Sequence, residues 1–227
     1  MARKYVYDTE TKNISFVQTA VDLKKLGVKN YMFFLKLYDP SLRGVDPHSP
    51  FLSKDQVFRI INECIINPWY YLREVARIPD QGNPAGIPYL LNRANLACTW
   101  CFINGIDHYE VIPRQIGKTQ STIAIITWAF LLGTTDSEIM FANMQSERAI
   151  ENLTRLKDQR DLLPPYLQFK VGYDEAGNVK KPTDNVKTLK NINNKNSIVT
   201  KPSARSIETA ERIGRGRLVP LCIVICI

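Results

Sequence analysis

The sequence predicts an α/β fold in which a parallel sheet is flanked by helices. Short apolar runs typical of strands, at Tyr109–Pro113 and Ser137–Asn143, alternate with longer helical runs, at Thr119–Gly133 and Gln145–Leu162. Such alternation favours parallel pairing, because the helix between two strands carries the chain back to the same end of the sheet. We therefore expect a parallel sheet in the second half of the chain.

The first part of the chain reads mainly as helices. Apolar residues at helical spacing predict one helix over Phe16–Leu26, and Ser53 with Gln56 has the spacing of a capping box that opens another, which stops near Asn67. Large aromatic side chains dominate burial, so we expect the aromatic residues of this region to form its core rather than a partner surface. These residues are Tyr31, Phe33, Phe34, Trp69, Tyr70 and Tyr71.

After this helix the sequence predicts a short helix over residues 68–79, a turn-rich loop over residues 80–88 and a third helix over Leu90–Ile103. Together with the strand and helix alternation, this predicts two domains. One is a mainly helical region over residues 1–85, and the other an α/β domain over residues 86–227.

Composition and charge narrow the class of protein. Of the 227 residues, 44% are hydrophobic and 23% charged, which excludes a largely disordered chain. No apolar run approaches the roughly 18–20 residues that span a bilayer, and the N-terminus lacks the pattern of a signal peptide, so we expect no membrane. The chain carries a net charge of +8, and residues 180–217 hold ten basic and three acidic residues, a local excess of +7. This segment is either a binding surface for a polyanion or a solvated basic face.

Apolar runs at 186–189 and 197–200 flank Asn193-Asn194 and predict a hairpin.

The cysteines, five in all, are an odd number, which indicates reduced thiols in a cytosol-like compartment. Two cysteine pairs have the spacing of zinc ligands, but apolar helical and strand-like runs contain them, so we expect buried thiols and keep a zinc site as the alternative. The pairs are Cys98 with Cys101 and Cys222 with Cys226.

The most specific chemical signal lies between the first predicted strand and the helix that follows it. Residues 112–119 read IPRQIGKT and end in Gly-Lys-Thr, where a phosphate-binding P-loop is expected. Gly117 lets the backbone approach phosphate oxygens, Lys118 would bind the β- and γ-phosphates of ATP, and Thr119 would ligate Mg²⁺. Ile112 replaces the first glycine of the usual pattern, and the alternative is a surface turn that contains a lysine.

A loop written Arg-Gln-x-Gly-Lys-Thr without the first glycine resembles that of the large terminase subunit of tailed bacteriophages, the ATPase that packages viral DNA. The segment 141–168 resembles the family's next strand and helix, and 197–216, with Arg215-Gly216, the approach to its Walker B strand. The likeness covers about residues 90–216. It implies a P-loop NTPase-like fold with an N-terminal helical extension, and an ATP hydrolase that uses Mg²⁺.

The resemblance also assigns residues and partners. Arg114 would contact the γ-phosphate and act in catalysis with Lys118, while Asn95 would occupy the position of a glutamine that reads adenine, or else be an asparagine on a helix surface. It further implies double-stranded DNA, a portal and a small terminase subunit as partners, a homo-oligomeric ring for the full-length protein, and the cytoplasm of an infected bacterium. The residues expected to bind ATP are Asn95, Gln115, Ile116, Gly117, Lys118, Thr119 and Gln120, with Thr119 on the metal.

The Walker B carboxylates that the family carries after Arg215-Gly216 are missing, since no acid follows Glu211. We therefore expect a truncated product whose ATPase domain is incomplete at the C-terminus, with weak ATP binding and negligible hydrolysis by itself. Two alternatives stay open. One is a fragment of a helicase-like P-loop translocase, and the other a basic nucleic-acid-binding protein without ATPase activity.

Overall fold

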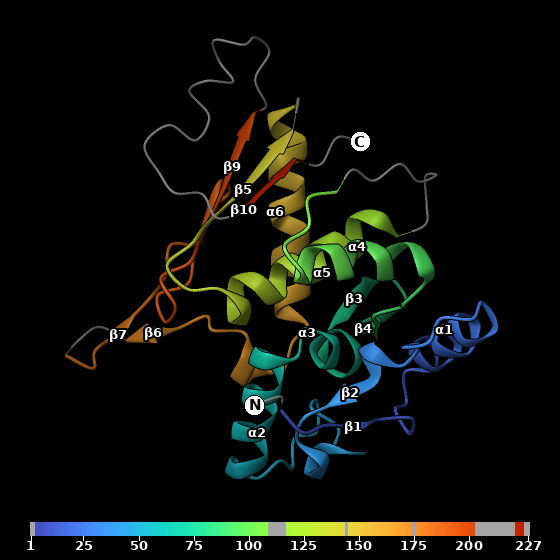
Figure 1. The fold of residues 1–227 in the computed structure, drawn as a ribbon. Helices are drawn as coiled ribbons and strands as arrows, with labels where there is room; N and C mark the ends of the chain where they lie inside the picture. The colour runs from blue at the N-terminus through green and yellow to red at the C-terminus, as the bar shows by residue number, and fades with distance from the viewer. Residues whose placement is uncertain (1–2, 109–116, 144, 174–175, 203–220, 225–227) are drawn as a thin grey trace. The chain divides into compact units, whose positions relative to one another are not determined.

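A computed structural model describes residues 3–108, 117–143, 145–173, 176–202 and 221–224 (Figure 1). The chain forms two compact units, and the boundary between them falls inside helix α5 (Lys118–Trp128). Unit 1 comprises residues 1–125 and 161–167, and unit 2 comprises residues 126–160 and 168–227. The division expected between residues 85 and 86 stays a prediction.

Unit 1 is mainly helical and holds two small antiparallel sheets, one of β1 with β2 and one of β3 with β4. The predicted helices at 16–26, 53–67 and 90–103 are confirmed within a few residues at each end. The predicted helix over residues 68–79 ends at Val75 instead, and the chain turns into a strand at Arg77. The elements are β1 (Val6–Tyr7), α1 (Ile14–Lys25), η1 (Phe33–Leu35), β2 (Lys36–Leu37), η2 (Pro40–Leu42), α2 (Lys54–Ile66), α3 (Pro68–Tyr70), η3 (Tyr71–Val75), β3 (Arg77–Asp80), β4 (Asn83–Pro88), α4 (Arg93–Ile103), the start of α5 and η5 (Pro165–Leu167).

The start of α2 shows how local sequence sets a helix boundary. The Ser53 hydroxyl accepts the Gln56 N–H at 3.2 Å, and the Gln56 side chain accepts the Ser53 N–H at 2.9 Å. This is the predicted capping box, which satisfies two backbone donors that no helical carbonyl can reach. At the other end Asn67 leaves the helical conformation and caps α3, so one asparagine closes one helix and opens the next.

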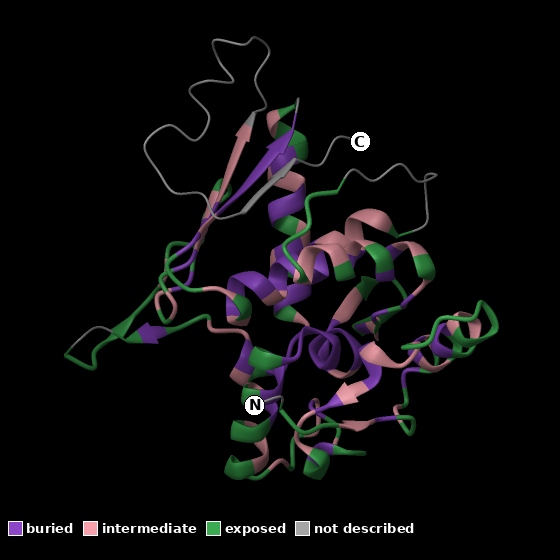
Figure 2. Ribbon diagram, viewed as in Figure 1, coloured by how far each residue is buried: buried purple, intermediate pink, exposed green. Residues whose placement is uncertain are grey.

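The predicted aromatic core of unit 1 is confirmed for four of its six residues, whereas Tyr31 and Phe33 are only half-buried. Phe34, Tyr70 and Tyr71 are fully buried and Trp69 nearly so. The Phe33 and Phe34 rings contact the Trp69 ring with centroids 5.6 and 6.0 Å apart. Figure 2 shows this buried centre in purple around α3. The contact between Phe33 and Trp69 is edge-to-face, an arrangement that adds about 0.5–1.5 kcal/mol to the burial of a ring pair.

The predicted loop over residues 80–88 is wrong, because β3 and β4 form a hairpin there. The prolines of this segment are tolerated, since a two-stranded sheet has two free edges that need no N–H donor. Gly86 adopts a φ of +67°, and a Cβ at this position would lie 2.8 Å from both the Ile78 carbonyl oxygen and Leu162 Cδ1. The hairpin therefore requires glycine at residue 86.

Unit 2 contains a mixed sheet with strand order β10-β5-β9-β8. The predicted α/β class is confirmed at this level: β10, β5 and β9 are parallel, whereas β8 is antiparallel to β9. Figure 2 shows β5 buried along nearly its whole length, as expected for a strand flanked on both sides. The elements are the end of α5, η4 (Ala129–Gly133), β5 (Glu138–Asn143), α6 (Ser146–Asp161), β6 (Gly172–Tyr173), β7 (Val179–Lys180), β8 (Thr188–Lys190), β9 (Ser197–Pro202) and β10 (Leu221–Val224).

The predicted hairpin around Asn193-Asn194 is confirmed as β8 and β9, with Leu189 opposite Ile198. Its connection, residues 191–196, is rich in asparagine, and we call it the asparagine loop. The strand-like reading of the run that contains Cys222 is confirmed for residues 221–224, which pair with β5. The first predicted strand, Tyr109–Pro113, lies outside the described residues.

The asparagine loop closes the end of the helical run formed by α5 and η4. Asn194 Nδ2 donates to the carbonyls of Phe130 and Leu131 at 2.8 and 3.1 Å. Asn196 Nδ2 donates to the carbonyls of Phe130 and Thr134 at 2.8 and 2.7 Å, and its Oδ1 accepts the Ser137 N–H at 2.9 Å. Helices end with carbonyls that lack an internal partner, and here two side-chain amides supply the missing donors.

Candidate functional site

The Gly-Lys-Thr motif lies at the beginning of α5. Gly117 has a φ of +77°, a left-handed conformation that glycine adopts without strain, and Lys118 is the first helical residue. The Gly117 carbonyl accepts the Ser121 N–H at 2.9 Å and so closes the first turn. This local geometry places the backbone N–H groups of the first turn at the free end of the helix. Arg114, Gln115 and Ile116 lie outside the described residues.

The first turn of α5 carries no acidic residue. A helix N-terminus has a partial positive charge, so acidic side chains or bound anions stabilise it and a lysine does not. Within the described part of the chain, the Lys118 ammonium and the Thr119 hydroxyl form no hydrogen bond or ion pair, and both residues are half-buried. Positive charge therefore accumulates at this turn without a described carboxylate to balance it, which is the electrostatic condition for binding an anion.

Asn95 does not lie on a helix surface as the alternative expectation had it, since only 5% of the residue is exposed. It occupies the first turn of α4, where its Oδ1 accepts the Asn92 N–H at 2.7 Å in a second capping box. Its Nδ2 donates to the Leu90 carbonyl at 2.8 Å and to Ser121 Oγ at 3.1 Å. The structure thus brings Asn95 to the first turn of α5, through Ser121.

Ser121 is the residue that sequence reasoning missed at this site. It lies in the apolar run that predicted a buried helix, and a single serine in such a run carries no pattern that would single it out. A signal was present only in the spacing, because Ser121 falls one helical turn after Gly117 and therefore lies on the same face of α5. Its role becomes visible only when α4 and α5 are placed together within unit 1.

The described side chains offer few ligands to a metal ion. Among the described residues no group of three or more His, Cys, Asp or Glu side chains could hold a metal ion. Cys98 and Cys101 both lie on α4, outside any disulfide and half-exposed, so the helix is confirmed but the expected burial of this pair is wrong. The Thr119 hydroxyl is available as a ligand, because it has no partner in the described part.

A polar residue also lies at the carboxyl end of β5 in unit 2, the edge of the parallel strands at which open α/β sheets bind ligands. The buried Asn143 ends β5, and its Oδ1 accepts the Gln145 N–H at 3.4 Å. The end of this strand at Asn143 was predicted from the sequence, but no role for its side chain was.

The basic segment is described as far as residue 202. We call its lysines there the lysine segment, and none of them forms an ion pair with a described residue. The stretch contains one acid, Asp184, which pairs instead with Lys157 at 2.6 Å and Arg160 at 2.9 Å on α6. Burial alone would raise the pKa of Asp184, but the hydrogen bonds from these two cations outweigh it and hold the pKa below its usual value. The lysine segment comprises Lys180, Lys181, Lys187, Lys190, Lys195 and Lys201.

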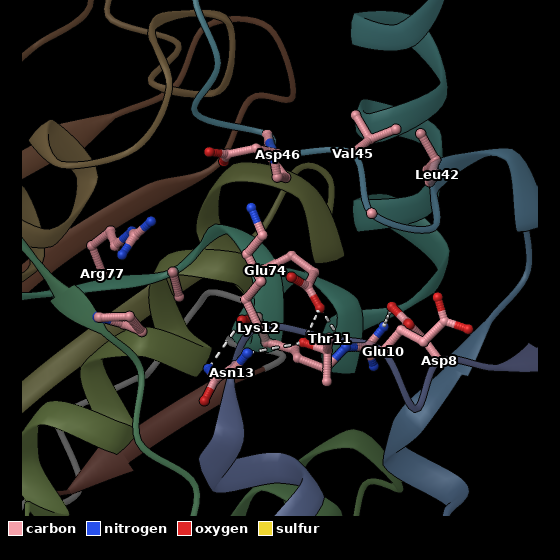
Figure 3. Close-up of a pocket in the computed structure, with 15 residues that line it drawn as sticks. Asp8, Glu10, Thr11, Lys12, Asn13, Leu42, Val45, Asp46, Glu74 and Arg77 are labelled. Atoms are coloured by element: carbon pink, nitrogen blue, oxygen red, sulfur yellow. Dashed lines mark hydrogen bonds and ion pairs between the residues drawn. The ribbon is translucent and has the colours of Figure 1, made fainter.

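Unit 1 also contains a pocket of about 130 Å³ that none of the predicted site residues lines (Figure 3). Its wall includes the apolar Leu42 and Val45, and its charged residues have both signs. At its base the buried Arg73 binds Glu74 at 2.7 Å and Asp8 at 3.4 Å, and Thr11 donates to Glu74 at 2.6 Å. These bonds join two segments of unit 1 that are far apart in sequence, one around Asp8 and Thr11 and the other at Arg73 and Glu74.

No family model matches the chain, and no curated protein is significantly similar to it. None of the helices in the described part combines the length and the apolarity that crossing a bilayer would require.

Proposed function

We propose that this chain is the ATP-binding part of a viral DNA-packaging motor of the large-terminase type. The observation that carries the proposal is the start of α5, where a left-handed Gly117 precedes Lys118 and Thr119 at a helix end without an acidic residue. If the motif were only a surface turn, nothing would explain why Lys118 lies at the positive end of a helix without a described acidic partner. An anion bound there removes this imbalance.

The chain's own groups have distinct roles in this proposal. The N–H groups at the start of α5 bind phosphate oxygens, and the Lys118 ammonium neutralises the β- and γ-phosphates. Thr119 offers its hydroxyl to Mg²⁺, which on binding neutralises charge on the transferring phosphoryl group. Arg114 is proposed to stabilise that charge from the loop, as the resemblance implies.

The lysine segment supports double-stranded DNA as the partner. Lysines without acidic partners gain most from phosphates, because each neutralised phosphate releases a condensed counterion. Since the one acid of this stretch is paired with α6, nearly all of its positive charge is available. A portal, a small terminase subunit, a ring of subunits and an infected bacterial cytoplasm belong to the proposal through the resemblance alone.

Nucleotide binding tests the proposal directly. Titration calorimetry with ATP and Mg²⁺ is expected to detect binding by the unmodified chain and at least tenfold weaker binding by Lys118→Ala, because the phosphate contact is lost. Lys187→Ala, which removes an exposed lysine from the lysine segment, is the matched control and should leave ATP affinity unchanged. Equal ATP affinity in Lys118→Ala and the unmodified chain would exclude the ATPase assignment.

A second candidate function is a nucleic-acid-binding module without ATPase activity, which the unpaired lysine segment favours. It predicts DNA binding that weakens steeply with salt and does not respond to ATP or to Lys118→Ala. A helicase-like translocase shares the ATP-binding prediction and differs in separating the strands of a duplex. Filter binding to a duplex at several salt concentrations, with and without ATP, distinguishes the binding module from a motor.

A further inference from the structure

One side-chain hydrogen bond joins α4 to the first turn of α5. Asn95 Nδ2 donates to Ser121 Oγ at 3.1 Å, and both residues are buried, with 5% and 9% of their surface exposed. Ser121 lies directly above the turn that begins with Gly117, whose carbonyl accepts its N–H. A bond shielded from water at this point restrains the end of α5 that carries Lys118 and Thr119.

The rest of the Asn95 side chain is already committed. Its oxygen accepts the Asn92 N–H, and the second hydrogen of its amide goes to the Leu90 carbonyl. A side-chain amide has two donor hydrogens, so no donor is left for a ligand. Recognition of a base by an amide needs a free donor and a free acceptor together, and Asn95 offers no such pair.

We infer that Asn95 and Ser121 form a tether that positions the phosphate-binding end of α5, and that Asn95 does not read the nucleotide base. The inference rests on the proposed function, because it assigns a role within the same site. Asn95 is held by the first turn of α4, so the tether transmits the position of α4 to the N–H groups of α5. Binding of phosphate then costs less ordering, since the turn is already restrained before the ligand arrives.

The cleanest test is Ser121→Ala, which removes the tether and leaves the capping box of α4 intact. The probes are ATP, GTP and inorganic triphosphate, each with Mg²⁺, measured by titration calorimetry. A buried hydrogen bond contributes about 1 kcal/mol, so affinity for all three probes is expected to fall by about fivefold. The ratio of ATP to GTP affinity should stay unchanged, because the base is not involved.

Thr122→Ala is the matched control, since it removes a hydroxyl from the same turn whose bond, among the described residues, is to the Lys118 carbonyl of its own helix. It should leave all three affinities unchanged. Hydrogen exchange without nucleotide gives a second readout: the amides of residues 118–121 should exchange faster in Ser121→Ala than in Thr122→Ala. A residue with a merely structural role would lower the melting temperature without changing the affinity for inorganic triphosphate.

The possible failures are distinguishable. If Asn95→Ala weakens ATP binding but spares GTP and inorganic triphosphate, Asn95 reads the base and the inference is wrong. The same holds if Ser121→Ala changes neither affinity nor exchange while Lys118→Ala abolishes binding. If Lys118→Ala leaves all three affinities unchanged, the proposed function fails and the tether has no phosphate site to position.

Discussion

The helical run from Lys118 to Gly133 has two ends that the chain treats in opposite ways. At its beginning, the side chains of Lys118 and Thr119 have no partner in the described part, and no acid balances the helix dipole. At its end, Asn194 and Asn196 donate to several carbonyls that the helix itself leaves unpaired. A protein satisfies buried polar groups where it needs stability. An unbalanced end is therefore the better candidate for binding a ligand.

The largest expected effect is a loss of stability at the end of the helical run whose carbonyls are paired. Asn196 is fully buried, and Asn196→Ala removes the partner of the Thr134 carbonyl and of the Ser137 N–H, while the Phe130 carbonyl keeps only its bond from Asn194. We expect the free energy of unfolding to fall by about 3 kcal/mol, because buried groups lose their hydrogen bonds without gaining water. Urea unfolding monitored by circular dichroism measures the change.

Asn193→Ala is the control for this prediction. Asn193 belongs to the same asparagine loop but is exposed, and its side-chain amide makes a single long bond of 3.3 Å to the Val171 carbonyl. The expected loss is within about 0.5 kcal/mol, as for most surface substitutions. Equal losses in the two variants would show that the asparagine loop does not close the helical run in the manner described.

A smaller effect on stability is expected at the beginning of α5, where no acid balances the helix dipole. Lys118→Glu replaces a cation by an anion at the positive end of α5, and we expect the free energy of unfolding to rise by about 0.5–1 kcal/mol in low salt. Lys118→Gln should give an intermediate rise. Thermal unfolding in low and high salt measures both, and a loss of stability in Lys118→Glu would mean that the lysine already has a partner that stabilises the fold.

The smallest expected effect concerns the paired acid of the lysine segment. The pKa of Asp184 is lowered in the folded protein, so its ion pairs contribute stability above the ordinary pKa of 3.8. That contribution is lost as the pH falls through the lowered pKa. Because about a third of the side chain is exposed, we expect only about 0.5 kcal/mol. Asp184→Asn should remove it at pH 7 and leave the stability difference near zero once the pH is below the lowered pKa, as measured by urea unfolding.

Asp158→Asn serves as its control, since Asp158 is an exposed carboxylate on the same helix as Lys157 and Arg160. It should change stability little at either pH. Asp184→Asn also frees two cations, so its DNA affinity should rise slightly at low salt. A fall in affinity would contradict the view that the lysine segment contacts phosphates.

Much of the fold follows from local patterns. The capping box at Ser53 and Gln56, the helix end at Asn67 and the β8–β9 hairpin were all predicted, because each depends on residues close in sequence. The β3–β4 hairpin was missed. The glycines and prolines of this segment predict turns, and the pairing of its two halves as strands leaves no signal in the local sequence. The antiparallel direction of β8 made the sheet mixed instead of wholly parallel.

The candidate site also has one part that local sequence predicts and one part that it does not. The position of Lys118 at the start of a helix was predicted from the Gly-Lys-Thr motif and is confirmed. The burial of Asn95 and its bond to Ser121 were not predicted, because they depend on how α4 and α5 pack. A motif fixes the residues of a turn, whereas the groups that hold the turn in place come from elsewhere in the sequence.

The end of the helical run also constrains how related chains can vary. A Cβ on Gly133 would lie 2.6–2.9 Å from three ring atoms of Trp128, so the indole ring occupies the space that any side chain would need. A side chain at residue 133 would have to displace the indole ring, so we expect residues 128 and 133 to vary together. Homologues with a smaller residue at 128 should accept other residues at 133. Such covariation would indicate that their helices end in the same way.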